Sequence, residues 1–383
     1  MKTQEPITYI GVDDIEAPLF ESQFALPHGM AYNSYVITDD KIAVMDTMER
    51  GHREQWFANL DEALDGRTPD YLIVHHMEPD HSAAIAQFME RYPNAVIVSS
   101  KMAFDMAKRY FGDGYEGRRI VVTNGSELDL GHYHLHFISA PMVHWPEVMM
   151  SFIPELGALF SADAFGKFGA NAQPSDWLAE ARRYYFAIVA RFGANVQALL
   201  KKLAPLDIAA IYPLHGFVLD NPAAYIPYYQ TWSSYEPEKK GVTIAFTSIY
   251  GNTRLAAELL EKTLQDKGIE VALYDLSRCD MTEAIASAFM YDRLVIASTT
   301  YNMDVFPLMR DFLERLVERN FTKRCVGIIQ NGSWSPAAGR VMKGILEPAK
   351  DLTYTDTTVT IEAALSEQSR AEIAALANEL DQQ

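Results

Sequence analysis

The chain has 383 residues, a length typical of two domains, and its proportions of apolar and charged residues are those of a globular protein. Its formal net charge of −18 at pH 7 argues against a nucleic-acid partner, because such proteins need basic surface to displace counterions. The two cysteines, Cys279 and Cys325, form no C-x-x-C pair, so the sequence indicates neither a thiolate metal site nor a disulfide framework.

The beginning of the chain, MKTQEPITYIGVDD, has no basic segment followed by an apolar one, and no apolar stretch is long enough to span a membrane. We therefore expect a cytoplasmic protein without a membrane partner. Many short β-like runs follow, at 33–38, 41–47, 71–75, 95–100, 119–123, 132–138, 148–153 and 158–163. Helical patterns lie between some of them and beyond, at 82–91, 101–110 and 175–202. This mixture predicts β-sheets sandwiched between helices.

A polar segment, SSYEPEKKG at 233–241, separates two differently patterned parts of the chain. We expect one domain at 1–238 and a second at 241–383. In the second domain, almost continuously apolar runs alternate with helical patterns, and these runs lie at 242–247, 270–275, 293–299 and 325–330. Strands that are covered on both faces have this composition, so the second domain is predicted to be a doubly wound parallel sheet.

The segment HHMEPDH, residues 75–81, places several metal-ligand types in a turn after a buried strand. Its spacing, H-x-E-x-D-H, involves His76, Glu78, Asp80 and His81. Alternation is expected to point the first three of these to one side, which favours a metal site over an ordinary polar turn. A helical di-iron bundle also uses Glu-x-x-His, but Pro79 interrupts that spacing between Glu78 and His81.

Three further polar residues each follow an apolar run: His144, Asp163 and His215. Each alone is typical of a satisfied core or loop residue, but together with the first motif they predict a pair of metals. Four histidines and three carboxylates in this order resemble the metallo-β-lactamase superfamily, whose hydrolases usually carry H-x-H-x-D-H. Glu78 stands here in place of the second histidine.

That glutamate, with EPDHS at 78–82 and HWP at 144–146, resembles the flavodiiron proteins, and the resemblance extends over nearly the whole chain. Other matching stretches lie at 29–37, 140–147 and 159–166. The resemblance implies an α/β chain with an N-terminal metallo-β-lactamase-like αββα sandwich, followed by a flavodoxin-like doubly wound parallel sheet. It also implies two non-haem irons with an oxo or hydroxo bridge, because iron tolerates mixed imidazole and carboxylate ligands whereas zinc cannot change oxidation state.

By this resemblance, His76, Glu78 and His144 hold one iron, Asp80, His81 and His215 hold the other, and Asp163 bridges them. The remaining histidines receive different roles. His75 is expected to point the opposite way along the strand and to pack in the core. The three histidines of the run 132–136 share one face of a strand and are expected to face solvent. The resemblance places His28 and Tyr32 beside the gas pocket.

Residues 247–253, TSIYGNT, form neither G-x-G-x-x-G nor a Walker loop, but their hydroxyl and backbone N–H groups suit a phosphate at a helix N-terminus. A plain helix cap looks similar. Loops at 298–304 and 331–335 follow two further strands, and Tyr301 and Trp334 supply aromatic surface for a flat ring. Together the three loops resemble flavodoxins and imply FMN. The expected FMN-binding residues are Thr247, Ser248, Ile249, Tyr250, Gly251, Asn252, Thr253, Ser298, Thr299, Thr300, Tyr301, Asn302, Asn331, Gly332, Ser333 and Trp334.

An iron pair and FMN in one chain imply a reductase of O2 to water, of NO to nitrous oxide, or of both, serving in detoxification. The electrons balance, since a diferrous pair and FMN hydroquinone together supply the four that O2 needs, whereas two NO need only two. The resemblance implies a head-to-tail homodimer or a dimer of dimers, in which the FMN of one subunit faces the irons of another. No C-x-x-C follows the second domain, so we expect an external donor such as rubredoxin.

Two other functions remain open. A dizinc hydrolase of the same superfamily would use the flavodoxin-like domain as an accessory, and a non-catalytic flavoprotein would only carry electrons. Metal analysis with a visible spectrum distinguishes the hydrolase, which would contain zinc and no flavin. Gas consumption distinguishes the carrier, because the loss of Glu78 would leave it unchanged.

Overall fold

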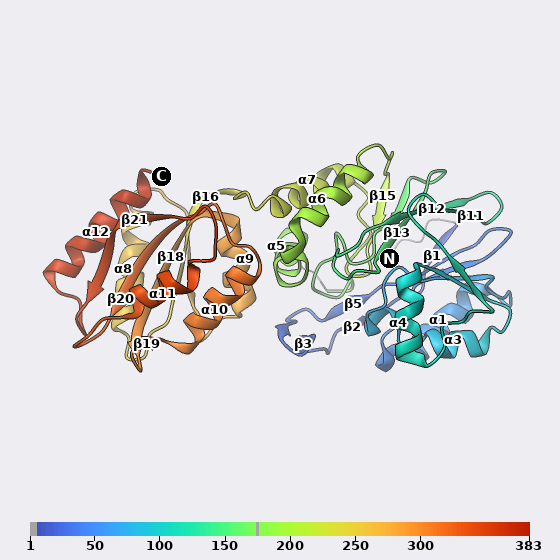
Figure 1. Ribbon diagram of the computed structural model, residues 1–383, viewed down its shortest axis with the longest axis horizontal. Coiled ribbons are helices and arrows are strands. Elements are labelled where there is room, and N and C mark those ends of the chain that lie inside the picture. The colour runs from blue at the N-terminus through green and yellow to red at the C-terminus, as the bar shows by residue number, and fades with distance from the viewer. Residues whose placement is uncertain (1–5, 174–175) are drawn as a thin grey trace. The chain divides into compact units, whose positions relative to one another are not determined.

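The computed structural model describes residues 6–173 and 176–383, and contacts divide the chain into two compact units, Met1–Gln230 and Thr231–Gln383 (Figure 1). Residues 1–5 of the expected first domain and residue 175 of the helix expected at 175–202 lie outside the described residues. The division falls within α7 (Pro222–Ser233), and the expected boundary at 238–241 stays a prediction. None of the described helices is long and apolar enough to cross a membrane.

Two larger sheets form the N-terminal unit. The first has the order β1 (Ile7–Tyr9), β6 (Tyr35–Ile37), β7 (Ala43–Met45), β8 (Tyr71–Ile73), β9 (Val96–Ser99), β10 (Arg119–Val121). The second has the order β11 (Glu127–Asp129), β12 (His134–Ser139), β13 (Met149–Ile153), β14 (Ala158–Phe160), β15 (Ala210–Tyr212). One buried cluster draws on both sheets, and within it the rings of Tyr35 and Phe160 lie 5.7 Å apart. The two sheets therefore pack face to face around a common core.

Helices cover the outer faces of these sheets. They are α1 (Arg53–Leu64), α3 (Ile85–Arg91), α4 (Lys101–Phe111), α5 (Trp177–Tyr184), α6 (Gly193–Leu203) and α7. The short α2 (Pro79–Ser82) follows β8, and a 3-10 turn lies at Arg50–His52. Figure 1 shows α1, α3 and α4 beside the first sheet and α5, α6 and α7 beside the second, which confirms the αββα sandwich. Two small hairpin-like pairs, β2 (Val12–Asp14) with β5 (Met30–Tyr32) and β3 (Leu19–Phe20) with β4 (Phe24–Ala25), complete the described part of the unit.

The helical pattern at 175–202 corresponds to two α-helices, α5 and α6. A π-helical turn at Tyr185–Val189 and a 3-10 turn at Ala190–Phe192 separate α5 from α6. Tyr184, Tyr185 and Phe186 are all buried. The end of α5 and the start of the π-helical turn are therefore covered on more than one side.

The C-terminal unit is built on a parallel sheet. Its strands run in the order β17 (Val271–Asp275), β16 (Lys239–Phe246), β18 (Tyr291–Tyr301), β20 (Cys325–Asn331), β21 (Thr353–Ile361), with β19 (Asp304–Val305) paired to β18. Its helices are α8 (Asn252–Gln265), α9 (Met281–Met290), α10 (Pro307–Glu318), α11 (Ala338–Leu346) and α12 (Glu367–Asp381). This order is that of flavodoxin-like doubly wound sheets, as expected. The edge strand β21 was not predicted, because its threonine-rich sequence lacks the apolar run of a doubly covered strand.

Candidate metal centre and cofactor pocket

Loops at the ends of strands carry the candidate metal ligands. β14 and β15 pair in parallel with Phe160 opposite Tyr212, so Asp163 and His215 follow their strands by the same number of residues and meet at one edge. His144 lies in the loop between β12 and β13, at the same end of that sheet. The turn after β8 brings the remaining ligands from the opposite sheet.

The turn after β8 divides its ligands between two groups. Glu78 is extended, with φ −60° and ψ 140°, and its side chain makes no capping hydrogen bond, so the carboxylate is free to face the site. Pro79 then starts α2, which carries Asp80 and His81 in its first turn. The expected common side therefore holds for His76 and Glu78 but is wrong for Asp80, because the helix begins between them.

Asp46 fixes this turn from behind. Its backbone is left-handed, with φ 57°, and its buried carboxylate accepts the backbone N–H of His75 at 2.7 Å. The other carboxylate oxygen lies 2.5 Å from His75 Nδ1, and Ser151 Oγ lies 2.8 Å from His75 Nε2. His75 is thus fully occupied outside the candidate site, as the sequence predicted.

The first group consists of His76, Glu78, His144 and Asp163, whose ligand atoms all lie within 4.8 Å of one another. Glu78 Oε2 lies 3.1 Å from the Nε2 atoms of both His76 and His144. Asp163 Oδ2 lies 3.0 Å from His144 Nε2 and 3.4 Å from His76 Nε2.

The second group consists of Asp80, His81 and His215, all buried. Asp80 Oδ2 lies 3.2 Å from His81 Nε2 and 3.3 Å from His215 Nε2. The other oxygen of Asp163, Oδ1, lies 3.3 Å from His81 Nε2 and 3.7 Å from His215 Nε2. Asp163 therefore presents one oxygen to each group, the arrangement of a carboxylate that bridges two cations. His81 points into the site like the others.

The charges in the centre stabilise one another. Burial opposes ionisation of Asp163, yet His76 and His144 hold its pKa well below the usual range. Burial likewise opposes the charged imidazoles, but Asp80 and Asp163 raise the pKa of His81 to about 10. Asp163 and Glu78 raise the pKa of His144 to about 9. In the metal-free centre, carboxylates therefore pair with imidazolium groups. Protons occupy the ring nitrogens that would otherwise bind cations.

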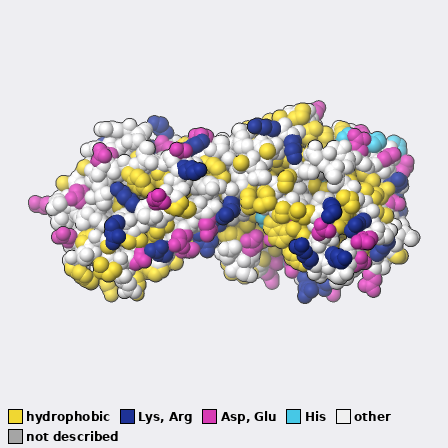
Figure 2. All heavy atoms as spheres, viewed as in Figure 1, with side chains coloured by type: hydrophobic (Ala, Val, Ile, Leu, Met, Phe, Trp, Pro, Cys, Tyr) yellow, Lys and Arg dark blue, Asp and Glu magenta, His cyan; other side chains and the backbone are white. Residues whose placement is uncertain are grey.

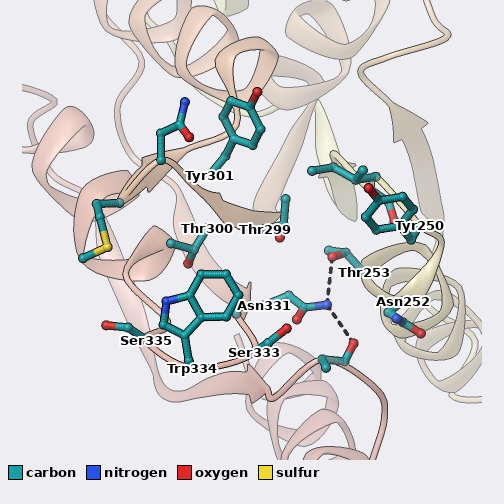
Figure 3. A pocket seen from close by; sticks show the side chains of 16 residues that line it. Tyr250, Asn252, Thr253, Thr299, Thr300, Tyr301, Asn331, Ser333, Trp334 and Ser335 are labelled. Carbon is teal, nitrogen blue, oxygen red and sulfur yellow. Dashed lines mark hydrogen bonds between the residues drawn. The ribbon is translucent and has the colours of Figure 1, made fainter.

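A cavity of about 420 Å³ opens in the C-terminal unit, a size suited to a cofactor. Figure 3 shows Tyr250, Tyr301 and Trp334 standing around it from three different loops. Asn331 Nδ2 donates to Thr253 Oγ1 and to the Ala363 carbonyl, both at 3.3 Å, and so joins the loops at the floor. The expected residues that line it are Ser248, Ile249, Tyr250, Asn252, Thr253, Thr299, Thr300, Tyr301, Asn302, Asn331, Gly332, Ser333 and Trp334.

Three expected FMN residues do not line this cavity. Thr247 and Ser298 are buried beneath it, where their hydroxyls lie 2.9 Å apart. Gly251, with φ 95°, takes the left-handed position before α8, and its N–H donates to Ser248 Oγ at 3.1 Å. Met303, Ser335 and Ala363 also line the cavity, although they were not among the expected FMN-binding residues.

Comparison with known proteins agrees with the two domains. The family model "ODP family beta lactamase" matches residues 30–216, and the flavodoxin model matches residues 244–368. Two solved structures share the fold over 100% of this chain: the rubredoxin oxygen:oxidoreductase of Desulfovibrio gigas and the flavodiiron protein of Giardia intestinalis. Their TM-scores are 0.92 and 0.91, their identities 22% and 23%, and 98% and 97% of their chains are covered.

Sequence relatives are closer. The anaerobic nitric oxide reductase flavorubredoxin of Aliivibrio fischeri is 29% identical over 87% of this chain and 69% of the relative. The nitric oxide reductase of Moorella thermoacetica is 30% identical over 90% of this chain and 88% of the relative. The chain belongs to the flavodiiron protein family. It is accordingly an oxidoreductase, with a metallo-β-lactamase-like domain and a flavodoxin domain.

The metal centre of this flavodiiron protein has the donors that the family's iron pair requires. Asp80 Oδ1 has no hydrogen-bond partner among the described residues. Asp80 Oδ2 and Asp163 Oδ1 face imidazole nitrogens at 3.2 to 3.7 Å without forming a hydrogen bond. Buried oxygens of this kind are costly unless a cation meets them. Mixed imidazole and carboxylate ligands suit iron, and the hydroxyl-rich cavity of the other unit suits FMN.

Other histidines of this flavodiiron protein lie outside the centre. His132, His134 and His136 lie at the surface, where Figure 2 shows histidine side chains (cyan), and each has a carboxylate neighbour. His132 forms with Asp39 and Asp40 a further group that could hold a cation, but it is on the surface, where such groups are common without one.

Of the two residues expected beside the gas pocket, Tyr32 contacts the candidate ligand His215. Its ring lies 5.7 Å from that of His215 and stacks on His52 at 5.9 Å. The side chain of His28 is exposed, and its backbone carbonyl accepts from Ala170 N. The contacts thus support the expectation for Tyr32, whereas that for His28 stays a prediction.

Two residues of the flavodiiron centre were not predicted. Tyr184 is fully buried, its ring lies 5.6 Å from that of His215, and its hydroxyl has no hydrogen-bond partner within the described part of the chain. Glu147 lies 2.8 Å from His76 Nδ1. Tyr184 gave no signal, because it stands in an aromatic run that resembles core. Glu147 lies three residues after the candidate ligand His144, in the sequence HWPE, and this proximity was the signal that could have indicated its role.

Loading the metal centre is expected to release protons. His81 and His144, with pKa values of about 10 and about 9, hold protons at neutral pH in the metal-free protein, and a metal must replace them. Their raised pKa values mean that protons compete less as the pH rises. The apparent affinity for ferrous iron should therefore increase from pH ~6 to ~8. Because the pKa of His76 is also raised well above its usual value, calorimetry in two buffers should report about three protons released per subunit. An affinity independent of pH would contradict this, whereas His136→Ala should not alter the dependence.

Trp334 is expected to stack on the flavin. Its side chain is 88% exposed beside the cavity, so removing it costs little packing within the protein. Trp334→Ala should weaken FMN binding about tenfold, whereas Trp334→Phe should keep most of the affinity because a ring remains. Quenching of FMN fluorescence on titration into flavin-free protein measures both. Equal affinities of the two variants would show that the ring does not stack.

Proposed function

We propose that this protein reduces O2 to water, NO to nitrous oxide, or both, at a di-iron centre that FMN re-reduces, and that it serves in detoxification of these gases. In this proposal residues 1–238 carry the irons and residues 241–383 carry FMN. The reducing cytoplasm suits the two free cysteines.

The position of Asp163 carries the proposal. One of its oxygens faces His76 and His144 and the other faces His81 and His215. Each group also contains one further carboxylate, Glu78 or Asp80. Hydrolases with zinc pairs rely on imidazole-rich sites, whereas a redox pair benefits from anionic ligands that stabilise the oxidised metal.

The names of related proteins support both gases. The relatives from Moorella thermoacetica and Aliivibrio fischeri are named nitric oxide reductases, and the similar structure from Desulfovibrio gigas is named a rubredoxin oxygen:oxidoreductase. We infer the same pair of substrates for this chain, and a small redox protein such as rubredoxin as the electron donor.

In this proposal, the residues around the centre have different roles. Four imidazoles, whose Nε2 atoms face Asp163, would hold the metals together with that carboxylate. The metals and FMN, when bound, supply the electrons. The hydroxyl of Tyr184, unpartnered among the described residues, is available to donate a hydrogen bond to a small ligand in the centre. The rings of Phe20, Tyr32 and Tyr184 surround His215 and exclude bulk water.

We further propose a head-to-tail dimer, alone or paired with a second dimer, in which each cofactor pocket meets the metal centre of another copy. Exposed apolar side chains rim the pocket, among them Tyr250 at 93% and Met303 at 63% exposure. On the N-terminal unit, Leu19 is 47% exposed, next to Phe20, whose ring lies 5.4 Å from that of His215. Apolar surface at both sites supports a contact that joins them.

Glu78→Ala tests the reaction. Losing a ligand of the first metal should lower NO and O2 consumption at least ~100-fold, with chemically reduced rubredoxin as the donor. His136→Ala, a surface control, should retain wild-type rates. Anaerobic NO electrode traces and oxygen uptake give both rates, and their ratio in the wild type decides the preferred gas.

The rival functions predict other results. Purified protein with two zinc ions and no flavin band would identify a hydrolase and reject the reductase. Unchanged gas consumption in Glu78→Ala would identify a plain electron carrier. Iron at about two per chain with a stoichiometric flavin band supports the reductase.

Leu19→Glu tests the dimer. A charge on the proposed contact should lower the mass measured by light scattering at micromolar concentration and lower turnover at least ~10-fold, because one buried charge at an interface costs several kcal/mol. Iron and FMN content should stay at wild-type levels. Ile120→Glu is the matched control, since Ile120 is 37% exposed on the edge strand β10, and it should change neither mass nor turnover. A wild-type monomer with full turnover would reject the dimer.

A further inference from the structure

Glu147 is a buried carboxylate that contacts a metal-ligand candidate without belonging to either group. Its side chain is 2% exposed. Its Oε1 lies 2.8 Å from His76 Nδ1 and also accepts the backbone N–H of Met77 at 2.9 Å. The loop that carries it is fixed in turn, because Ser100 Oγ donates to the Glu147 carbonyl at 3.0 Å.

This contact settles which nitrogen of His76 faces the centre. The Oε1 atom of Glu147 accepts, so His76 donates from Nδ1 and keeps Nε2 for a metal. Nε2 indeed lies toward Glu78 and Asp163, at 3.1 and 3.4 Å. A carboxylate behind an imidazole fixes the ring orientation and makes the ligating nitrogen a better donor.

The second group lacks an equivalent carboxylate. His215 Nδ1 donates to the neutral carbonyl of Ala31 at 2.8 Å. His81 Nδ1 is buried and has no hydrogen-bond partner within residues 6–173 and 176–383. In the first group, therefore, His76 is hydrogen-bonded to a charged carboxylate. In the second group, His215 is hydrogen-bonded to a neutral carbonyl, and His81 Nδ1 has no hydrogen-bond partner among the described residues.

We propose that Glu147 is a positioning residue that makes the two metal positions unequal. The position at His76, Glu78 and His144 binds its metal more tightly, fills first and empties last. The position at Asp80, His81 and His215 completes the pair. This inference rests on the proposed function only in requiring two metals of the same kind.

Anaerobic titration of metal-free, FMN-loaded protein with ferrous iron, in competition with a chromophoric chelator, tests the proposal. The wild type should show two separate affinities. Glu147→Gln keeps an acceptor for Met77 N–H and His76 but removes the charge, and should weaken the tighter affinity about tenfold. Glu147→Ala removes the acceptor as well, and should weaken it about 100-fold. The weaker affinity should fall much less than the tighter one in both variants, because Glu147 contacts His76 of the first group and not the second group.

A spectroscopic measurement assigns the affinities to positions. One equivalent of ⁵⁷Fe should give a single Mössbauer doublet in the wild type and two doublets in Glu147→Gln, because the two positions then compete. Glu155→Gln is the matched control. Glu155 Oε1 lies 2.7 Å from Nδ1 of the surface residue His134. The variant Glu155→Gln therefore changes the same kind of carboxylate–histidine contact away from the metals, and both affinities should stay unchanged.

The results separate this inference from the proposed function. FMN content and the thermal midpoint of the same preparations report whether each variant folds. Equal affinities in the wild type, unchanged affinities in Glu147→Gln, or an equal loss at both positions would overturn the role of Glu147 while leaving a di-iron reductase intact. A wild type that binds no iron pair would instead reject the proposed function.

Discussion

The N-terminal unit depends on the burial of Asp163. A carboxylate removed from water costs several kcal/mol unless opposite charge meets it. Asp163 is 1% exposed, and both of its oxygens face imidazoles. Protons fill this requirement in the metal-free protein, and cations would fill it better, because Oδ1 has no hydrogen-bond partner among the described residues. The remaining features of the centre can be understood as ways of supplying positive charge on both sides of one side chain.

Neither sheet could supply that charge alone. His76, Glu78, Asp80 and His81 come from the turn after β8 in the first sheet, whereas His144, Asp163 and His215 come from loops of the second. Each group therefore takes ligands from both sheets. Bound metals would join the two layers across their edge, so that cofactor binding and the stability of the sandwich are linked by mass action.

The sequence was informative where chemistry restricts the residue type. Metal ligands must be histidine or carboxylate, and they had to follow apolar strands, so all seven candidates came together in the structure. The flavin loops were found because their hydroxyl and aromatic residues also follow apolar strands. Residues that act through geometry were missed: Glu147 is a ligand-type residue whose role depends on the rotamer of His76, and Tyr184 looks like any core tyrosine. Asp80 and Glu78 belong to different groups of ligands because a helix starts between them. Alternation along a strand does not predict where a helix starts.

Long-range geometry limited the fold prediction in a similar way. Strands covered on both faces were recognised by their apolar runs, but β21 at the sheet edge is only half covered and its sequence is polar enough to pass for a loop. The helical pattern at 175–202 does not indicate that a π-helical and a 3-10 turn divide it into two helices. Local patterns therefore define the elements, and contacts distant in sequence decide where they end.

The π-helical turn at Tyr185–Val189 also affects the rotational phase of its neighbours. An α-helix turns about 100° per residue, so the extra residue of the wide turn rotates everything after it relative to everything before. Tyr184 can thus face His215 while Val196 and Leu199, further along, still face the core. The ring that lies beside the metal centre and the side chains that bury the next helix thus belong to two helices, with the π-helical and 3-10 turns between them.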